Sequence, residues 1–122
     1  MLVIKGDRKI PMKKNRMRIK GNYVYKHKDV REFEMWLSYL ASVAMKKQNW
    51  VKTDGFVSMH IDVVFGDKRR RDLQNCFGAV CDSLNEVVYV DDCQIVKLSA
   101  TKRYVKSEWS FIIKIELCHD VA

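Results

Sequence analysis

The stretch "FVSMHIDVVFGDKRRRDLQNCFGAVCDSL", from Phe56 to Leu84, decides how this chain folds. Its first ten residues alternate between apolar and polar side chains. The apolar phase holds Val57, Met59, Ile61, Val63 and Phe65, and the polar phase holds Ser58, His60 and Asp62. A period of two predicts a half-buried strand in an antiparallel or mixed sheet. We interpret His60 and Asp62 as part of its solvated face.

The hydrophobic period changes beyond Gly66, where a basic run leads into a helical pattern. Apolar residues then recur every three or four positions, which predicts an amphipathic helix that starts near Asp72. Its apolar stripe consists of Leu73, Cys76, Phe77, Val80, Cys81 and Leu84. Strand, basic loop and helix therefore follow one another directly in this stretch.

Upstream of the stretch, the sequence predicts a strand, a hairpin and a long helix. Residues 2–5 form a short apolar run, and Gly21-Asn22 separates two alternating runs, as in a two-residue hairpin loop. Asp29 and Glu32 have the spacing of a capping box, so we expect the helix to run from Asp29 to about Gln48.

Downstream of the stretch, β character resumes. "VVYVDDCQIVKLSATKRYV" (87–105) and "SEWSFIIKIEL" (107–117) read as strands. The second has Trp109, Phe111, Ile113, Ile115 and Leu117 on one face. The order of elements predicts a single α+β domain over residues 1–122, with two main helices covering one face of a mixed or antiparallel sheet.

The charge distribution points to a polyanionic partner. The 122-residue chain has a formal net charge of +8, and nine Lys or Arg with no Asp or Glu lie between Arg8 and Lys28. Nucleic acid is the commonest partner of such a surface. No apolar run approaches the roughly 18 residues of a membrane span. The four cysteines form no CxxC pair, which argues against a zinc knuckle and favours free thiols in a reducing cytoplasm.

Two acidic positions flank the second helix. Asp72 lies where the basic loop enters it, and Asp91 and Asp92 follow it after "VVYV". If that segment returns beside Asp72, carboxylate oxygens converge as Mg²⁺ prefers. The basic run would then hold a phosphate backbone against a metal that polarises the phosphate and activates water. That run is Lys68, Arg69, Arg70 and Arg71.

A structural interpretation of the same residues is equally open. Asp72 could cap the second helix, because aspartate favours that position. Asp91 and Asp92 could form a turn, and the four cations could be a solvated run. The pattern alone leans slightly towards this interpretation.

The stretch "DKRRRDLQNCFGAVCDSLNEVVYVDDCQIVKLSATKRY" (67–104) resembles the central signature of the RusA family of Holliday junction resolvases. That signature is a basic run, then D-L-D-N, an amphipathic helix, and D-D-x-Q opening the next strand. The segments "PMKKNRMRI" (11–19) and "GNYVYKHKDVREFE" (21–34) also resemble the start of family members. The resemblance covers nearly the whole chain.

The resemblance implies a homodimer of small α+β subunits that binds four-way DNA junctions in recombination and repair. Such an enzyme cuts paired strands with Mg²⁺, and we expect Mn²⁺ to substitute. By position, Asp72 is the first aspartate of D-L-D-N and Asp92 the catalytic member of the D-D pair. The implied metal ligands are Asp72, Asp91, Asp92 and Gln74. Beyond the basic run, Lys13, Lys14, Arg16, Lys102 and Arg103 would extend the DNA footprint.

The chain departs from the family pattern at two positions. Gln74 stands where the family has its second aspartate, and Gly78 where it has a lysine. Glutamine offers a metal a neutral oxygen without charge, and the lost lysine removes a cation that stabilises developing charge. The alternative function is therefore a branched-DNA-binding protein with weak or lost nuclease activity. A third possibility is a basic domain that binds RNA or a protein partner. We expect a cytoplasmic location, in a bacterium or a phage-infected cell.

Overall fold

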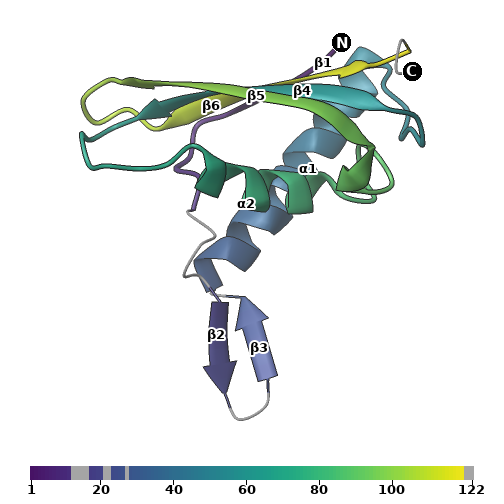
Figure 1. Ribbon diagram of the computed structural model, residues 1–122. Coiled ribbons are helices and arrows are strands. Elements are labelled where there is room, and N and C mark those ends of the chain that lie inside the picture. Colours follow the sequence, from purple (N-terminus) through teal and green to yellow (C-terminus); the bar gives the residue numbers. More distant parts are fainter. Residues whose placement is uncertain (12–16, 21–22, 27, 120–122) are drawn as a thin grey trace.

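The computed structural model describes residues 1–11, 17–20, 23–26 and 28–119, with the backbone alone for 17–20 and 23–26. Figure 1 shows the elements in chain order. They are β1 (Leu2–Gly6), β2 (Met17–Lys20), β3 (Tyr23–Lys26), α1 (Lys28–Gln48), β4 (Val57–Phe65), α2 (Gln74–Leu84), the 3-10 turn η1 (Asp92–Gln94), β5 (Ile95–Tyr104) and β6 (Ser110–Leu117).

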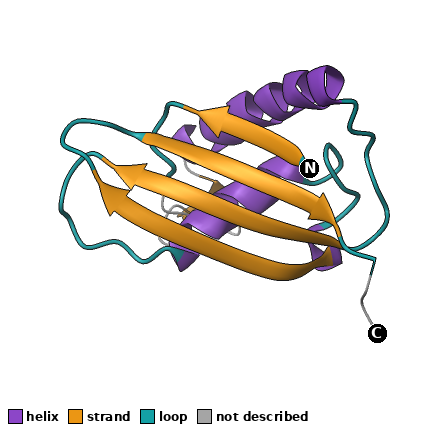
Figure 2. Ribbon diagram, turned by 90° about the horizontal axis from the view of Figure 1, so that it is seen from above, coloured by secondary structure: helices purple, strands orange, loops and turns teal. Residues whose placement is uncertain are grey.

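Four of the strands form one mixed sheet in the order β1-β6-β4-β5. β6 pairs antiparallel with both β1 and β4, whereas β4 and β5 are parallel. Figures 1 and 2 show α1 and α2 on the same face of this sheet. The structure therefore confirms the predicted α+β class and the helices on one face.

β2 and β3 form a separate antiparallel hairpin, with Lys20 opposite Tyr23. This register confirms that the two alternating runs pair as a hairpin, while the predicted loop residues Gly21 and Asn22 lie outside the described residues. In Figure 1 the hairpin projects away from the sheet, beyond the first turn of α1.

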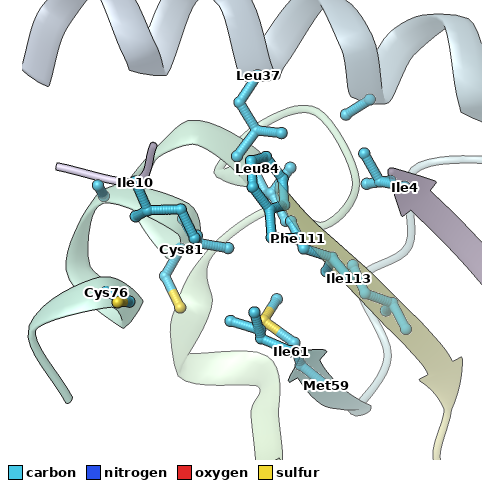
Figure 3. Close-up of a cluster of buried hydrophobic side chains, with 14 of the residues drawn as sticks. Ile4, Ile10, Leu37, Met59, Ile61, Cys76, Cys81, Leu84, Phe111 and Ile113 are labelled. Carbon is cyan, nitrogen blue, oxygen red and sulfur yellow. The ribbon is translucent and has the colours of Figure 1, made fainter. Parts of the chain in front are cut away.

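The core lies between the sheet and the two helices (Figure 3). Leu37 of α1 and Leu84 of α2 are fully buried, and they face Ile61 of β4 and Phe111 of β6 in this layer. Each such side chain contributes about 1.5–3 kcal/mol through the hydrophobic effect. Cys76 and Cys81 are buried and form no disulfide, as their place on the apolar stripe of the second helix predicts.

The segment 87–90 is not the strand that its β-branched residues predict. Glu86 has a positive φ of 64°, and its N–H donates to the Val90 carbonyl at 3.3 Å, so the chain reverses here. The Val88 carbonyl accepts from Thr53 N, and the Thr53 carbonyl accepts from Val90 N. β5 consequently begins only at Ile95.

Three smaller differences concern element ends. α1 begins at Lys28, so Asp29 lies in its first turn and is not its N-cap. α2 begins at Gln74, two residues beyond the expected start. Leu117 ends β6 with 46% of its surface exposed, although the alternation of the strand predicts it on the buried face.

Candidate nucleic-acid interface and acidic site

The loop between β4 and α2 is organised by an internal ion pair. Arg71 donates to both carboxylate oxygens of Asp67, and Arg69 N donates to the same group at 3.0 Å. These interactions, the bond from Arg71 above all, lower the pKa of Asp67 to about 2. The Arg71 side chain is 8% exposed and its guanidinium lies over the rings of Phe65 and Trp109.

The role expected for Arg71 therefore changes. The sequence predicts a phosphate ligand here, as for Lys68, Arg69 and Arg70, but the Arg71 side chain is turned into the loop towards Asp67. A buried guanidinium with a bidentate carboxylate partner fixes backbone geometry. We assign it to positioning the other cations. Its i, i+4 spacing from Asp67 was the one sequence signal for this pair.

Gly66 anchors the same loop against the turn that connects β5 and β6. A Cβ atom on Gly66 would lie 2.5 Å from Trp109 Nε1 and 3.0 Å from the Glu108 carbonyl oxygen. The Gly66 carbonyl accepts from Ser107 N at 2.9 Å. Only glycine allows this close approach, and it fixes the start of the β4–α2 loop against the β5–β6 turn.

The remaining cations of the loop join those at the end of β5. Lys102 Nζ donates to the Arg71 carbonyl at 3.1 Å, and Lys68 Nζ lies 5.1 Å from the centre of the Tyr104 ring. We call the resulting region the basic surface. It consists of Lys68, Arg69, Arg70, Lys102 and Arg103, all of them exposed. The other expected DNA contacts, Lys13, Lys14 and Arg16, lie outside the described residues.

Asp72 adjoins the basic surface and does not cap α2. The N-cap residue is Leu73, and its side chain makes no capping bond. Asp72 is exposed and shares a shallow pocket with Arg70, Arg71 and Asn75. Within the described residues its carboxylate has no hydrogen-bond or ion-pair partner, so the capping interpretation is not supported. Gln74, the first residue of α2, is also exposed.

Gln94 holds the turn that carries Asp91 and Asp92. Its Oε1 accepts from the N–H groups of Val90 and Asp91, both at 2.9 Å. Its Nε2 donates to the carbonyls of Thr53 and Gly55, at 2.9 and 2.8 Å. Both amide ends are thus satisfied in a side chain that is only 8% exposed. Sequence reasoning recorded the D-D-x-Q pattern but missed this role of its glutamine.

The two aspartates of the pair differ in their surroundings. Asp91 is the N-cap of η1, where its carboxylate accepts from Cys93 N at 3.4 Å. Hydrogen bonds from Cys93, first from its thiol and then from its backbone, lower the pKa of Asp91. Asp92 is half-buried, and in the part of the chain that the structure describes no hydrogen bond or ion pair engages its carboxylate. Asp92 is therefore the freer carboxylate of the two.

Asp72 and the Asp91–Asp92 pair lie at opposite ends of α2. Asp72 precedes its N-terminus, whereas Val90 is bonded to Glu86, two residues beyond its C-terminal Leu84. The helix has 11 residues, a length of about 16 Å. The expectation that "VVYV" carries the pair back to Asp72 is thus not met within one chain. The turn stabilised by Gln94 keeps it at the far end.

Among 1–11, 17–20, 23–26 and 28–119, no group of three or more His, Cys, Asp or Glu side chains is placed to hold a metal ion.

Over the same described ranges no helix has both the length and the apolar character that crossing a bilayer requires.

Comparison with known proteins identifies the family. A family model described as endodeoxyribonuclease RusA matches residues 8–116, nearly the whole chain. No curated protein matches. The matched range contains the basic surface, Asp72 and the Asp91–Asp92 turn, and the family implies endodeoxyribonuclease activity and binding of junction DNA. This chain belongs to the RusA family of endodeoxyribonucleases.

Proposed function

We propose that this protein is a Mg²⁺-dependent endonuclease that binds four-way DNA junctions and cuts paired strands during recombination and repair. The observation that carries the proposal is the exposed Asp72 carboxylate, which has no partner in the described chain and adjoins the basic surface. Mn²⁺ is proposed to substitute for Mg²⁺. The protein would act on DNA in the cytoplasm of a bacterial or phage-infected cell.

The basic surface supports recognition of DNA by shape. Its five cations lie on two segments, the β4–α2 loop and the end of β5. The hydrogen bond from Lys102 to the Arg71 carbonyl connects these segments. Contacts to phosphates position a protein on DNA but carry no sequence information directly. We propose that junction geometry, and not base sequence, determines where this surface binds.

The proposed metal site requires more than one chain. A single chain does not fit Mg²⁺, because Asp72 and the Asp91–Asp92 pair are separated by the length of α2. A two-fold homodimer with antiparallel α2 helices would place Asp72 of each copy beside the Asp91–Asp92 pair of the other. Such an isologous arrangement creates two identical sites, as paired cleavage needs. Gln74 would supply a neutral oxygen to each site.

The alternative is a branched-DNA-binding protein with weak or lost cleavage. Gln74 favours it, because this residue lies two positions from Asp72 on the exposed start of α2 and adds no charge. Gly78 favours it as well, because it replaces the family lysine. In this case the basic surface would bind junctions without metal.

Cleavage of a labelled synthetic four-way junction tests the proposal. The protein is incubated with Mg²⁺, Mn²⁺ or EDTA, beside linear duplex of the same sequence. Symmetric, metal-dependent cuts that are lost in Asp72→Asn support the nuclease. Salt-sensitive junction binding without cuts, with activity appearing in Gln74→Asp, supports the alternative. Equal binding to junction and duplex without cleavage by any variant contradicts both.

Mixing two inactive variants tests the composite site. Asp72→Asn and Asp92→Asn are each expected to be inactive as homodimers. A mixed dimer has one site with both substitutions and one with neither, so mixing should restore single nicks. If mixing restores nothing while the mixed dimers form, the two carboxylates do not meet across the dimer.

A further inference from the structure

The basic surface encloses a hollow that neither the sequence nor the family match assigns to a ligand. It has a volume of about 360 Å³, within the range of small-ligand pockets. Phe65 and the guanidinium of Arg71 line its inner part, and the end of β5 forms one wall. Phosphate binding alone needs a charged surface and not a cavity with aromatic walls.

Tyr104 is the feature of the hollow that phosphate contacts do not explain. It is the last residue of β5 and has 43% of its surface exposed. Lys68 Nζ lies 5.1 Å from the centre of its ring, a cation–π distance. An exposed aromatic ring beside lysine and arginine side chains is the arrangement on which nucleobases stack.

The cations of the hollow complement the other half of a nucleotide. Lys68, Arg69, Lys102 and Arg103 line it together with Tyr104. A base stacked on the ring would displace the Lys68 ammonium towards the phosphate of the same nucleotide. One ligand then satisfies both the aromatic and the charged groups, which neither a free anion nor an intact duplex does.

The hollow also adjoins the proposed cleavage site. Arg71 lines both this hollow and the shallow pocket that holds Asp72. Lys102 also lines the hollow, and its ammonium donates a hydrogen bond to the Arg71 carbonyl. A nucleotide in the hollow would therefore be a near neighbour of the phosphate presented to Asp72.

We propose that the hollow binds one unstacked nucleotide from the centre of a branched DNA, with its base on Tyr104 and its phosphate on the surrounding cations. This inference rests on the proposed function. It adds a base-binding subsite that holds the junction open beside the scissile phosphate. Extruding a base costs least where it is already unpaired or poorly stacked, so the subsite would favour a strand exchange point with disturbed stacking over intact duplex.

Equilibrium binding in EDTA tests the subsite separately from cleavage. Fluorescent four-way junction and linear duplex are titrated at several salt concentrations with wild type, Tyr104→Ala, Tyr104→Phe and Arg103→Gln. Tyr39→Ala is the matched control, because Tyr39 on α1 is 69% exposed and lies outside the hollow. Circular dichroism and urea midpoints verify that each variant is folded.

We expect Tyr104→Ala to weaken junction binding by about 5- to 150-fold, the range for loss of one stacked base. The salt dependence should not change, because no charge is lost, and Tyr104→Phe should recover most of the affinity. Arg103→Gln should instead lower the salt slope by about 1. Duplex binding should be insensitive to Tyr104→Ala.

An abasic scan of the junction provides a second measurement, and its first step uses the wild-type protein alone. Removing the stacked base should weaken wild-type binding at one nucleotide near the exchange point. On that junction Tyr104→Ala should have no further effect, because the two changes remove one interaction. If no abasic position weakens wild-type binding, the subsite does not exist.

Two other outcomes separate the subsite from the nuclease. If Tyr104→Ala binds junctions like wild type, or weakens duplex equally, the subsite is wrong while junction cleavage by wild type still stands. If wild type neither prefers nor cleaves junctions, the proposed function itself fails.

Discussion

The buried amide of Gln94 allows a sharp test of how the acidic turn is held. Gln94→Glu keeps the shape of the side chain and the oxygen that accepts from Val90 and Asp91. It replaces the amide donor with an oxygen that faces the carbonyls of Thr53 and Gly55. The new carboxylate oxygen and the carbonyl oxygens of Thr53 and Gly55 repel one another when no proton lies between them, so they cannot remain within hydrogen-bond distance. The introduced carboxyl must therefore hold a proton or break the turn.

The size of the effect follows from the four hydrogen bonds. A protonated carboxyl can donate to only one of the two carbonyls, so the free energy of unfolding falls by about 2 kcal/mol. Holding that proton at pH 7 against a normal glutamate pKa of about 4.3 costs up to about 3.7 kcal/mol more. The total loss at pH 7 is therefore roughly 5–6 kcal/mol, comparable to the whole stability of many domains.

The pH dependence has a defined sign. The introduced group has a folded-state pKa above its unfolded value. The variant is therefore closest to wild type below about pH 4 and loses stability as the pH rises through its folded-state pKa. We expect the difference in unfolding free energy between wild type and Gln94→Glu to grow by about 3 kcal/mol between pH 4 and pH 7.

Urea unfolding followed by circular dichroism at each pH measures this difference. Gln48→Glu is the matched control, because Gln48 also accepts from and donates to backbone groups, both of Val3 at 2.8 Å, but is exposed to water. It should lose about 1 kcal/mol with little pH dependence. An equal loss for Gln94→Glu at pH 4 and pH 7, or no loss at all, would refute the reasoning.

Three further predictions concern the loop and the thiols. Asp67→Asn should lower the urea midpoint at pH 7, and the difference from wild type should vanish as the pH falls from about 4 towards 2, because the folded-state pKa of Asp67 is about 2. Gly66→Ala should destabilise the fold by about 1–3 kcal/mol in urea unfolding, because its methyl group meets Trp109. At pH 8 a thiol reagent should modify exposed Cys93 in the native protein, measured by peptide mass spectrometry. Cys76 should react only on unfolding, because burial raises its pKa to about 11.

Each of these predictions has a control in the same chain. Asp54→Asn changes an exposed acid outside the loop and should not reproduce the pH profile of Asp67→Asn. Gly55→Ala should cost less than Gly66→Ala, because its closest contact is Thr53 Oγ1 at 3.4 Å. Rapid labelling of Cys76 without urea would contradict its burial, and a pH-independent effect of Asp67→Asn would contradict the ion pair.

Periodic segments were predictable because their pattern matches their packing. The alternation of 57–65 places Met59 and Ile61 under the helices, and the same rule holds for Phe111 and Ile113 in β6. α1 likewise buries one face, with Phe33, Leu37 and Ala41 among its buried residues. In each case burial of one face determines the local structure, so the sequence period suffices.

The turn before β5 was not predictable in the same way. Its four residues 87–90 have strong β propensity, but bonds to Thr53 and the Gln94 amide hold them in a reversal. Gln94 is close in sequence, but its amide is anchored on the carbonyls of Thr53 and Gly55, which are about 40 residues away, so no local rule reports the reversal. The separation of Asp72 from Asp92 depends on this turn and was missed with it. Family resemblance names the candidate carboxylates but does not predict their separation within a chain.

The strand order has a consequence for how the protein is made. The last strand, β6, lies between β1 and β4, so the first strand has no sheet partner until residues 110–117 have been synthesised. Strands that are far apart in sequence pair slowly, and their edges stay without hydrogen-bond partners until they do. Trp109 packs against Gly66 at the start of the β4–α2 loop, and it is synthesised just before β6. On the ribosome, the loop that carries Lys68, Arg69 and Arg70 would therefore lack its contacts with Ser107 and Trp109 until the β5–β6 turn has emerged.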